Sequence, residues 1–339
     1  MTTRQVWRLA RRPEGDIDKG DLTFTEEEQR APEAGEALVE VIYLSLDPTN
    51  RIWMSDREQY MPPVEVGDPM RGGICGRVVS SRAPGLPEGT LVAGLGEWAS
   101  HVIVEEGKVS PMRGVEGLPL AAAFGTFGGV GMTAYFGLLD IGQPQAGETL
   151  VVSAAAGGVG QIVGQIGKIK GCRVIGIAGG AEKCRFITED LGFDHAIDYK
   201  NEDVGVALDR LAPDGIDIDF ENVGGPIMQA VLERMNNFGR IPLCGLISQY
   251  NERGETQGGA PAYWETMLMR RLTVRGFIVT DFAPRFGEAA AQLGQWLAEG
   301  RLTTRQDVRQ GLDRADDYVK LLYSGGNFGK LLVEVSPPA

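Results

Sequence analysis

Short apolar strands alternate with amphipathic helices through the middle of this 339-residue chain, and this alternation constrains the fold more than any other feature. The helices run for about ten residues, which is typical of the units of a doubly wound parallel sheet. Uninterrupted Val and Ile runs fit strands that are covered on both faces. The pattern therefore predicts an α/β fold. The predicted strands are residues 149–153, 173–177, 195–198, 216–220, 239–244 and 273–279, and the predicted helices are 159–169, 181–191, 204–211 and 226–235.

The first 120 or so residues have a different character, because short strands lie there between Gly and Pro turns. Such spacing predicts a rolled, partly open β-barrel. A last strand at 329–335 is expected to return to this domain, since the parallel sheet already has its six strands. We predict a β-rich substrate domain of residues 1–125 and 300–339 and a dinucleotide-binding domain of residues 126–299. The predicted strands of the first domain are 37–45, 76–80, 90–94 and 99–104.

Charge and cysteine content exclude several classes of function. The formal net charge is −13, and no block of Lys and Arg interrupts it. We therefore expect no nucleic-acid or membrane partner. No apolar run reaches the roughly 18 residues of a membrane helix, and the first residues do not resemble a secretory signal. The four cysteines are far apart and form no C-x-x-C pair, which predicts free thiols and a cytoplasmic location; they are Cys75, Cys172, Cys184 and Cys244.

A glycine-rich turn predicts a dinucleotide site. Gly157, Gly158 and Gly160 follow a predicted strand and open a predicted helix. In that context glycines permit a tight turn and close approach of a pyrophosphate, and the helix N-terminus presents backbone N–H groups to it. The turn does not have the literal G-x-G-x-x-G spacing, so its position between strand and helix carries the prediction.

The end of the second strand favours NADPH over NADH. NAD-binding sheets usually carry Asp or Glu there, to bind the ribose 2′-hydroxyl. This chain instead has Ala178, Gly179 and Gly180, followed by Lys183 and Arg185. A cation at this place can pair with a 2′-phosphate. The alternative is that both cations are ordinary solvated helix residues.

Several segments resemble one known family. Taken in their order along the chain, these segments resemble those of the zinc-free medium-chain dehydrogenases/reductases. Within that superfamily they resemble the group of prostaglandin reductases, leukotriene B4 dehydrogenases and plant double-bond reductases. The resemblance implies a Rossmann domain plus a GroES-like barrel domain. It also implies NADPH-dependent reduction of the C=C bond of α,β-unsaturated ketones and aldehydes. The segments are 44–48 with Arg51, 131–137, 154–160, 222–225, 239–241, 244–251 and 326–330.

The same resemblance assigns NADPH contacts residue by residue. Lys183 falls on the 2′-phosphate position, Tyr199 on the adenosine side and Thr133 on the nicotinamide side. The chain departs from the group at 47–51, where Thr49 and Asn50 replace Tyr and Met. The substrate preference of the group is therefore not carried over. The other implied contacts are Gly157, Gly158, Val159, Gly160, Asn222, Cys244, Gly245, Leu246, Ile247, Ser248, Tyr250, Phe277, Ile278, Val279 and Asn327.

The residues that hold zinc in alcohol dehydrogenases of this superfamily are missing. Where those enzymes carry Cys and a Gly-His-Glu triplet, this chain has residues 45–47, Ser-Leu-Asp, and 72–74, Gly-Gly-Ile. No metal is therefore expected to activate an alcohol. Hydride must then reach a carbon that is already electrophilic, such as the β-carbon of an enone, and the α-carbon takes a proton. A hydrogen-bond donor at the carbonyl oxygen stabilises the developing enolate.

Tyr250 is our first candidate for that donor, because it follows the carboxyl end of a strand, where ligands gather in doubly wound sheets. A ribose hydroxyl of the cofactor is a second one. Trp53 and Tyr60 are candidate walls of the substrate pocket, and plain packing is the alternative for each aromatic. Two rival functions stay open: an NADPH:quinone oxidoreductase and a non-catalytic NADPH-binding protein. The apolar strand at 272–279 suggests a homodimer, because relatives pair such edge strands across a two-fold axis.

Overall fold

The computed structural model describes residues 3–114, 117–251 and 264–338, and the chain divides into two compact units. Unit 1 comprises Met1–Phe124, Gln306–Asn327 and Leu331–Ala339. Unit 2 comprises Gly125–Arg305 and Phe328–Lys330.

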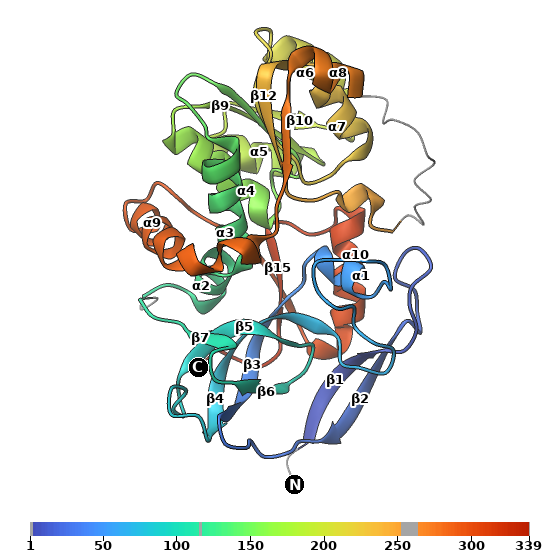
Figure 1. Ribbon diagram of the computed structural model, residues 1–339, viewed down its shortest axis with the longest axis vertical. Helices are drawn as coiled ribbons and strands as arrows, with labels where there is room; N and C mark the ends of the chain where they lie inside the picture. Colours follow the sequence, from blue (N-terminus) through green and yellow to red (C-terminus); the bar gives the residue numbers. More distant parts are fainter. Residues whose placement is uncertain (1–2, 115–116, 252–263, 339) are drawn as a thin grey trace. The chain divides into compact units, whose positions relative to one another are not determined.

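Unit 2 is built on a six-stranded parallel sheet with the order β10-β9-β8-β11-β12-β13 (Figure 1). This confirms the predicted doubly wound sheet. The central strand β8 is buried along its whole length, as its Thr-Leu-Val-Val sequence requires. The strands are β8 (Thr149–Val152), β9 (Arg173–Ala178), β10 (His195–Asp198), β11 (Ile216–Phe220), β12 (Met235–Leu243) and β13 (Thr273–Gly276).

Helices cover both faces of this sheet, with α3, α4 and α9 on one side and α6 and α7 on the other (Figure 1). Leu150 and Val152 pack toward the first group and Val151 toward the second, because successive side chains of a strand point to opposite faces. The helices are α3 (Gly129–Phe136), α4 (Gly158–Ile169), α5 (Ala181–Arg185), α6 (Val204–Leu211), α7 (Gly225–Leu232), α8 (Trp264–Arg270) and α9 (Phe286–Ala298). Single-turn pieces are π-helical at Gly137–Gly142 and Phe186–Asp190 and 3₁₀ at Ile247–Gln249 and Val279–Arg285.

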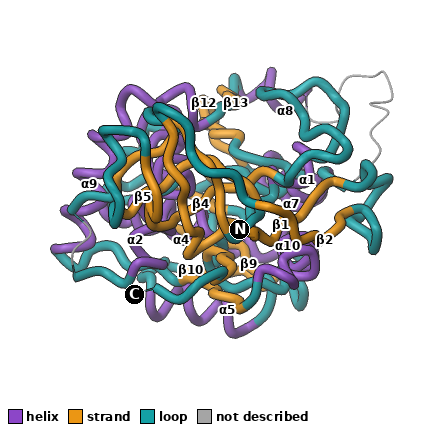
Figure 2. Tube along the Cα trace, turned by 90° about the horizontal axis from the view of Figure 1, so that it is seen from below, coloured by secondary structure: helices purple, strands orange, loops and turns teal. Residues whose placement is uncertain are grey.

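The last strand of the sheet is shorter than the sequence predicts. β13 ends at Gly276, where a strand to residue 279 was expected, and it lies beside β12 at the edge of the sheet (Figure 2). Phe277 leaves the strand because its ring packs edge-on against Phe220 and Phe282, with centroids 6.5 Å and 6.4 Å away. Aromatic packing therefore replaces the end of the predicted strand.

Unit 1 contains a two-stranded hairpin, β1-β2, and a seven-stranded sheet of order β14-β15-β3-β4-β5-β7, in which β6 also pairs with β3. β15 pairs antiparallel with β3, so the final strand does return to this unit as predicted. The strands are β1 (Thr3–Leu9), β2 (Leu22–Glu28), β3 (Glu36–Ser45), β4 (Arg71–Ser81), β5 (Leu91–Glu97), β6 (His101–Glu105), β7 (Val109–Pro111), β14 (Gln306–Gln310) and β15 (Lys330–Glu334). The helices are α1 (Thr49–Trp53), α2 (Leu120–Phe127, whose last three residues belong to unit 2), a 3₁₀ turn at Leu312–Arg314, and α10 (Ala315–Ser324).

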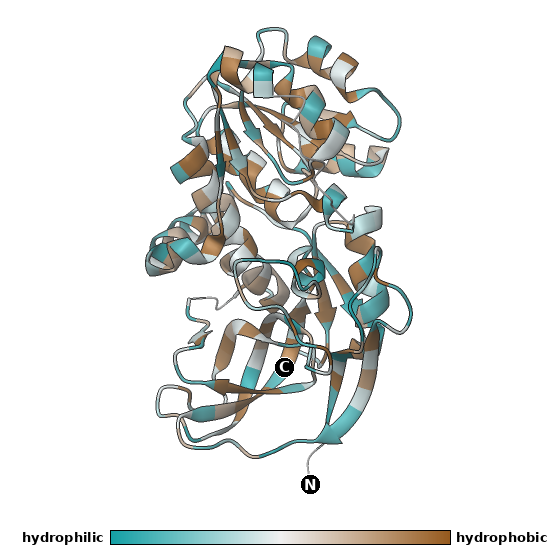
Figure 3. Cartoon of the chain, turned by 45° about the vertical axis from the view of Figure 1, so that its right-hand side comes forward, coloured by the Kyte–Doolittle hydropathy of each residue, from teal (hydrophilic) through white to brown (hydrophobic). Residues whose placement is uncertain are grey.

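The β1-β2 hairpin is absent from the sequence prediction. Its strands mix apolar and polar residues along their length (Figure 3), and Val6 and Leu9 are fully buried. Ion pairs from Arg4 and Arg8 to Glu27 lie across the two strands. Charged pairs thus occupy positions that, on sequence alone, make the segment look like a polar loop.

No single helix among the described residues is long and apolar enough to cross a membrane. One bent pair, Leu120–Phe127 with Gly129–Gly142, passes that test by length and composition only. Within the second helix of the pair, Met132, Phe136 and Leu138 are core residues of unit 2.

Candidate functional site

The strand order of the unit 2 sheet reverses between β8 and β11. Strands 8, 9 and 10 extend one way from this point and strands 11, 12 and 13 the other way. In open parallel sheets, ligands bind at the carboxyl ends of the strands at such a reversal. Two turns meet there, the turn at 153–157 after β8 and the turn at 221–224 after β11.

The glycine turn is held tightly against the start of α4. Ala154 has a left-handed φ of 49°, and its carbonyl accepts the Gly157 N–H at 2.9 Å. A Cβ added to Gly160 would lie 2.4 Å from the same Ala154 oxygen. Gly157 is the N-cap of α4, and among the described residues no side chain caps this helix. The turn therefore leaves room at a helix N-terminus, where backbone N–H groups and the helix dipole favour an anion.

A buried lysine that the sequence prediction missed lies against this turn. Lys330 is only 5% exposed, and a Cβ added to Gly158 would lie 3.1 Å from Lys330 Cδ. The neighbouring Gly329 N–H donates to Ala156 O at 3.0 Å. The segment Phe328–Lys330 therefore lies against the glycine turn, although it is far away in sequence.

The end of β9 brings together the residues predicted to select NADPH. A Cβ added to Gly179 would lie 2.9 Å from atoms of the Tyr199 ring, so glycine permits this close packing. Asp198 accepts the Gly180 N–H at 2.7 Å, which fixes the turn into α5. Lys183 is half-buried on α5, directly after this turn. The structure thus places Gly179, Tyr199 and Lys183 near the carboxyl end of β9.

The turns after β11 and β12 are bonded to each other and to the turn after β8. Asn222 Nδ2 donates to Ser153 O at 2.8 Å. Asn222 O accepts the Ile247 N–H at 3.2 Å, and Ser248 Oγ donates to Val223 O at 2.6 Å. The predicted contacts Asn222 and 244–248 are therefore one hydrogen-bonded group at the strand-order reversal.

Tyr250 folds back onto the same turn. Its hydroxyl oxygen accepts the Leu246 N–H at 3.0 Å. A Cβ added to Gly245 would lie 2.9 Å from that oxygen, so glycine makes room for the phenol. This places the predicted proton donor beside the predicted contacts 244–248.

Two buried acids lie beneath the turn, and the sequence prediction missed both. Asp219 and Glu221 are fully buried. Glu221 Oε1 accepts Ser153 Oγ at 3.0 Å, the Gly224 N–H at 2.8 Å and the Val223 N–H. Burial raises the pKa of Glu221, and burial together with the charge of Glu221 raises the pKa of Asp219. The alternation Ile-Asp-Ile-Asp-Phe-Glu was the available signal, because it sets its acids on one face of β11.

The remaining predicted residues of unit 2 lie in helices and loops. Thr133 is on α3, where its hydroxyl donates to Gly129 O at 2.7 Å. Phe277 and Ile278 connect β13 to the 3₁₀ segment that begins at Val279. From the sequence we also expect substrate-pocket residues around Asn251 to Trp264, and this segment falls largely on residues 252–263, outside the described residues.

Unit 1 holds Trp53, Tyr60 and Asn327. Tyr60 Oη accepts Trp53 Nε1 at 2.9 Å and is paired with Thr49 Oγ1 at 2.5 Å. Although 44% of Tyr60 is exposed, its hydroxyl lies against these two side chains, and burial raises its pKa. Trp53 and Tyr60 thus form one polar–aromatic pair.

At the positions where related enzymes carry zinc ligands, this chain has a hydrogen-bonded Ser45–Asp47 pair and two glycines of β4. Ser45 Oγ donates to Asp47 Oδ2. Gly72 and Gly73 lie in β4, where a Cβ on Gly72 would collide with the Trp98 ring at 2.7 Å. Within the described ranges, no group of three or more His, Cys, Asp and Glu side chains is arranged to hold a metal ion.

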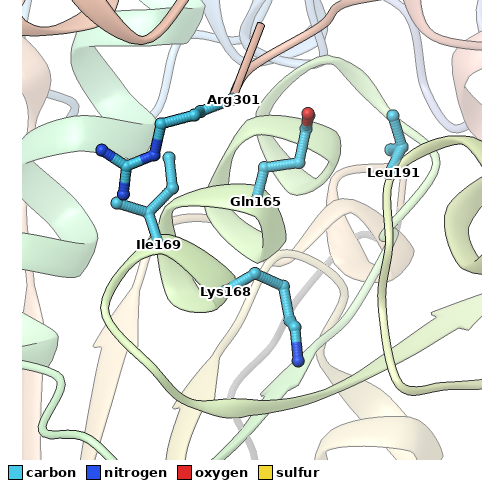
Figure 4. Close-up of a pocket in the computed structure, with 5 residues that line it drawn as sticks. All are labelled: Gln165, Lys168, Ile169, Leu191 and Arg301. Atoms are coloured by element: carbon cyan, nitrogen blue, oxygen red, sulfur yellow. The ribbon is translucent and has the colours of Figure 1, made fainter. Parts of the chain in front are cut away.

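A shallow pocket of about 290 Å³ lies at the other end of α4 (Figure 4). Its two cations both have acidic partners, because Lys168 pairs with Asp194 and Arg301 with Glu299. It is separated from the glycine turn by most of the length of α4 and does not belong to the site described above. Its lining residues are Gln165, Lys168, Ile169, Leu191 and Arg301.

Comparison with known proteins gives two family matches. Residues 5–112 match the N-terminal domain of oxidoreductase, and residues 158–296 match the family described as zinc-binding dehydrogenase.

Full-length relatives are also found. The chain is 43% identical to NADPH-dependent curcumin reductase of Escherichia coli, covering 97% of this chain and 96% of the relative. It is 39% identical to prostaglandin reductase 1 of Mus musculus, over 98% of this chain and 100% of the relative. The crystal structure of CurA in complex with NADPH from Vibrio vulnificus is 43% identical, with a TM-score of 0.93 over 98% of this chain and 100% of that one.

Proposed function

The chain belongs to the medium-chain dehydrogenase/reductase superfamily, in the group of the curcumin and prostaglandin reductases, and on this premise we propose that it is an NADPH-dependent reductase of activated C=C bonds. Its substrates are α,β-unsaturated ketones and aldehydes. The double bond gains a hydride at the β-carbon and a proton at the α-carbon. The observation that carries the proposal is the glycine turn at the strand-order reversal, in a chain that matches these reductases over nearly its full length.

The residues at this turn fit NADPH. Gly157 and Gly160 keep side chains away from the start of α4, and the stem of the buried Lys330 lies beside Gly158. We propose that Gly157, Gly158, Val159 and Gly160 bind the pyrophosphate through backbone N–H groups.

At the adenosine end, no acid ends β9 to bind a ribose 2′-hydroxyl, because its last residue is Ala178 and two glycines follow. We propose that Lys183 binds the 2′-phosphate and that Tyr199 packs beside the adenosine. A lysine supplies a point charge suited to a phosphate. This arrangement favours NADPH over NADH.

At the nicotinamide end, we propose contacts from the hydrogen-bonded turns after β11 and β12. NADPH, when bound, supplies the hydride. The nearby residues orient it and exclude water, which strengthens every polar interaction in the site. The proposed contacts are Thr133, Asn222, Cys244, Gly245, Leu246, Ile247, Ser248, Tyr250, Phe277, Ile278, Val279 and, from unit 1, Asn327.

Tyr250 is the proposed donor to the substrate carbonyl. Because its oxygen accepts the Leu246 N–H, the phenol is held in one orientation and is polarised as a donor. A donor aimed at the carbonyl oxygen stabilises the enolate that develops when hydride arrives. In unit 1, Trp53 and Tyr60 are proposed to contact the substrate, with Trp53 fixing the orientation of the Tyr60 hydroxyl.

The test is NADPH oxidation over a panel of enones, enals and quinones. We expect turnover of enones and enals, with consumption of one NADPH per reduced double bond. Turnover of quinones alone would identify an NADPH:quinone oxidoreductase instead. NADPH binding with no turnover across the whole panel would indicate a non-catalytic binding protein.

We propose that the protein is a cytoplasmic homodimer. The dimer proposal is supported by β13, the edge strand, whose four residues are all exposed, and by α8 with Leu268 and Met269 exposed beside it. A second copy pairing at this edge would satisfy its unpaired backbone groups. Light scattering should give twice the chain mass of 36.5 kDa, and Val274→Pro should reduce it toward the monomer. A monomeric wild-type protein at micromolar concentration would exclude the dimer.

A further inference from the structure

Asp219 and Glu221 are the two fully buried acids among the described residues of unit 2, and they lie at the strand-order reversal described above. Asp219 is paired in register with Val151 of β8, which faces α6 and α7. Register partners share a face, so the Asp219 carboxyl lies on the apolar side of the sheet that also buries Met228 and Ile241.

The two carboxyls are bonded very differently. Glu221 Oε1 accepts three hydrogen bonds, from Ser153 Oγ and from the Val223 and Gly224 N–H groups. Among the described residues, neither oxygen of Asp219 nor Glu221 Oε2 has a hydrogen-bond partner. Three donors stabilise a negative charge on Glu221, whereas an ionised Asp219 would be a buried charge without compensation.

Few titratable groups face this pair. One is the Cys244 thiol directly after β12, whose backbone N–H donates to Glu221 O at 2.9 Å; burial together with the charge of Glu221 raises the pKa of this thiol to about 12. Asp217, one step back on the same face of β11, is half-buried and accepts the Thr149 N–H and Asn236 Nδ2, each at 2.8 Å. Neither Cys244 nor Asp217 supplies a positive charge. One carboxyl of the Asp219–Glu221 pair must therefore take a proton to lower the negative charge of the pair.

We propose that Glu221 is a positioning residue that holds the 222–225 turn of the cofactor site, and that Asp219 remains a neutral carboxylic acid, so that the pair carries one negative charge. The turn it holds includes Asn222, whose Nδ2 also donates to Ser153 O in the turn after β8. The Glu221 carboxylate therefore fixes the distance between the two turns that meet at the reversal. This inference rests on the proposed NADPH site for its binding readout, but not for its stability readout.

The stability readout follows from proton linkage. Asp219 binds a proton when folded and releases it near its ordinary pKa of about 3.9 when unfolded. The unfolded state therefore binds fewer protons, so stability falls as pH rises from about 4 until the raised pKa of Asp219 is reached. Per pH unit, the unfolding equilibrium constant rises by up to about tenfold.

Asp219→Asn removes this titration. Urea midpoints of the full chain should show a stability gain for Asp219→Asn over wild type that grows between about pH 5 and pH 8. Asp217→Asn is the matched control, because it changes an acid two residues away on the same strand face, and its difference from wild type should not grow with pH. A gain from Asp219→Asn that is equal at all pH values would overturn the neutral acid. A stability gain that depends on added Na⁺ or K⁺ instead of pH would show that a bound cation compensates the charge of the pair. That result would overturn the proposed protonation of Asp219.

The binding readout tests Glu221. Glu221→Gln keeps the size of the side chain but removes the charge that the three donors recognise, so the NADPH Kd from fluorescence titration should rise by about tenfold or more. The kcat at saturating NADPH should fall much less than kcat/KM for NADPH, as expected for positioning. Ser153→Ala, which deletes one of the three donors, should give a smaller rise and serves if Glu221→Gln does not fold. Equal NADPH affinity in wild type and both variants would overturn the positioning role, whereas no NADPH binding by the wild type would refute the proposed function itself.

Discussion

Gln161 and Arg305 exchange two hydrogen bonds, from Gln161 Nε2 to Arg305 O at 3.0 Å and from Arg305 N to Gln161 Oε1 at 2.8 Å. One helical turn later, Gln165 makes the same pair of bonds with the backbone of Thr303. Both glutamines are buried on α4. Each amide therefore both donates to and accepts from one backbone residue, as a neighbouring strand would. Together they hold the segment at 303–305 to the helix that follows the glycine turn.

Replacing Gln161 with Leu should destabilise unit 2 strongly. The substitution removes both bonds to the Arg305 backbone, and only its C=O keeps a partner, the Lys330 N–H at 3.0 Å, so we expect a loss of about 1–3 kcal/mol. Urea denaturation of the full chain measures the loss. Gln292→Ala is the control, because Gln292 is half-buried on α9 and its side chain donates to the side chain of Gln295, and it should stay within about 0.5 kcal/mol of wild type. Equal midpoints for the two variants would contradict a structural role for the Gln161 amide.

A side chain at Gly160 should disrupt the glycine turn. The Cβ of Gly160→Ala would meet the Ala154 oxygen at 2.4 Å and Ala155 Cα at 2.8 Å, and backbone atoms cannot move aside cheaply. We expect a stability loss of about 1–3 kcal/mol and a weaker NADPH complex. Gly287→Ala is the matched control, since its new Cβ meets nothing within 4 Å in α9. It should stabilise the protein slightly and leave the NADPH Kd unchanged, and a similar loss of NADPH binding in both variants would argue against the turn as the site.

The regular parts of the fold were predictable, because β8 and β9 are rich in consecutive Val, Ile and Leu residues that a covered parallel sheet can bury. The glycine turn was predictable for the same reason, since its place between strand and helix follows from the pattern. The burial of Asp219 and Lys330 was not predicted, because it depends on long-range packing. The alternation in β11 indicates only that its acids share one face of the strand, not that this face is buried. The end of β13 was wrongly predicted because Phe277 exchanges strand pairing for contact with Phe220, which lies far away in the sequence.

Lys183 should determine the choice of cofactor. Lys183→Ala removes the cation proposed to bind the 2′-phosphate, so the Kd for NADPH should rise by about 10- to 100-fold, while the Kd for NADH, which lacks that phosphate, should change little. Fluorescence titration with both cofactors measures the ratio. Lys170→Ala removes an equal charge from the exposed end of α4 and controls for the general field of the protein. A parallel weakening of NADPH and NADH would show that Lys183 does not contact the 2′-phosphate.

Tyr250→Phe tests the proposed proton donor. The variant keeps the ring but removes the hydroxyl, whose oxygen accepts the Leu246 N–H at 3.0 Å. If the phenol donates to the substrate carbonyl, kcat for an enone should fall by about 10²-fold or more, because general acid catalysis contributes on this scale. The NADPH Kd should change far less, since the loss of one neutral hydrogen bond to Leu246 is worth about 1 kcal/mol.

The matched control for that experiment is Tyr135→Phe. Tyr135 lies on α3, and its hydroxyl donates to Glu288 at 3.2 Å, so the same atom is removed from a tyrosine that is part of the core. Its kcat should remain close to that of the wild type. Measuring kcat and KM between about pH 6 and pH 9 separates two explanations for a slow Tyr250→Phe variant. A lost donor lowers kcat throughout this range. A displaced 244–248 turn raises KM for NADPH as well. An unchanged kcat would remove Tyr250 as the donor and leave a ribose hydroxyl of the cofactor as the remaining candidate.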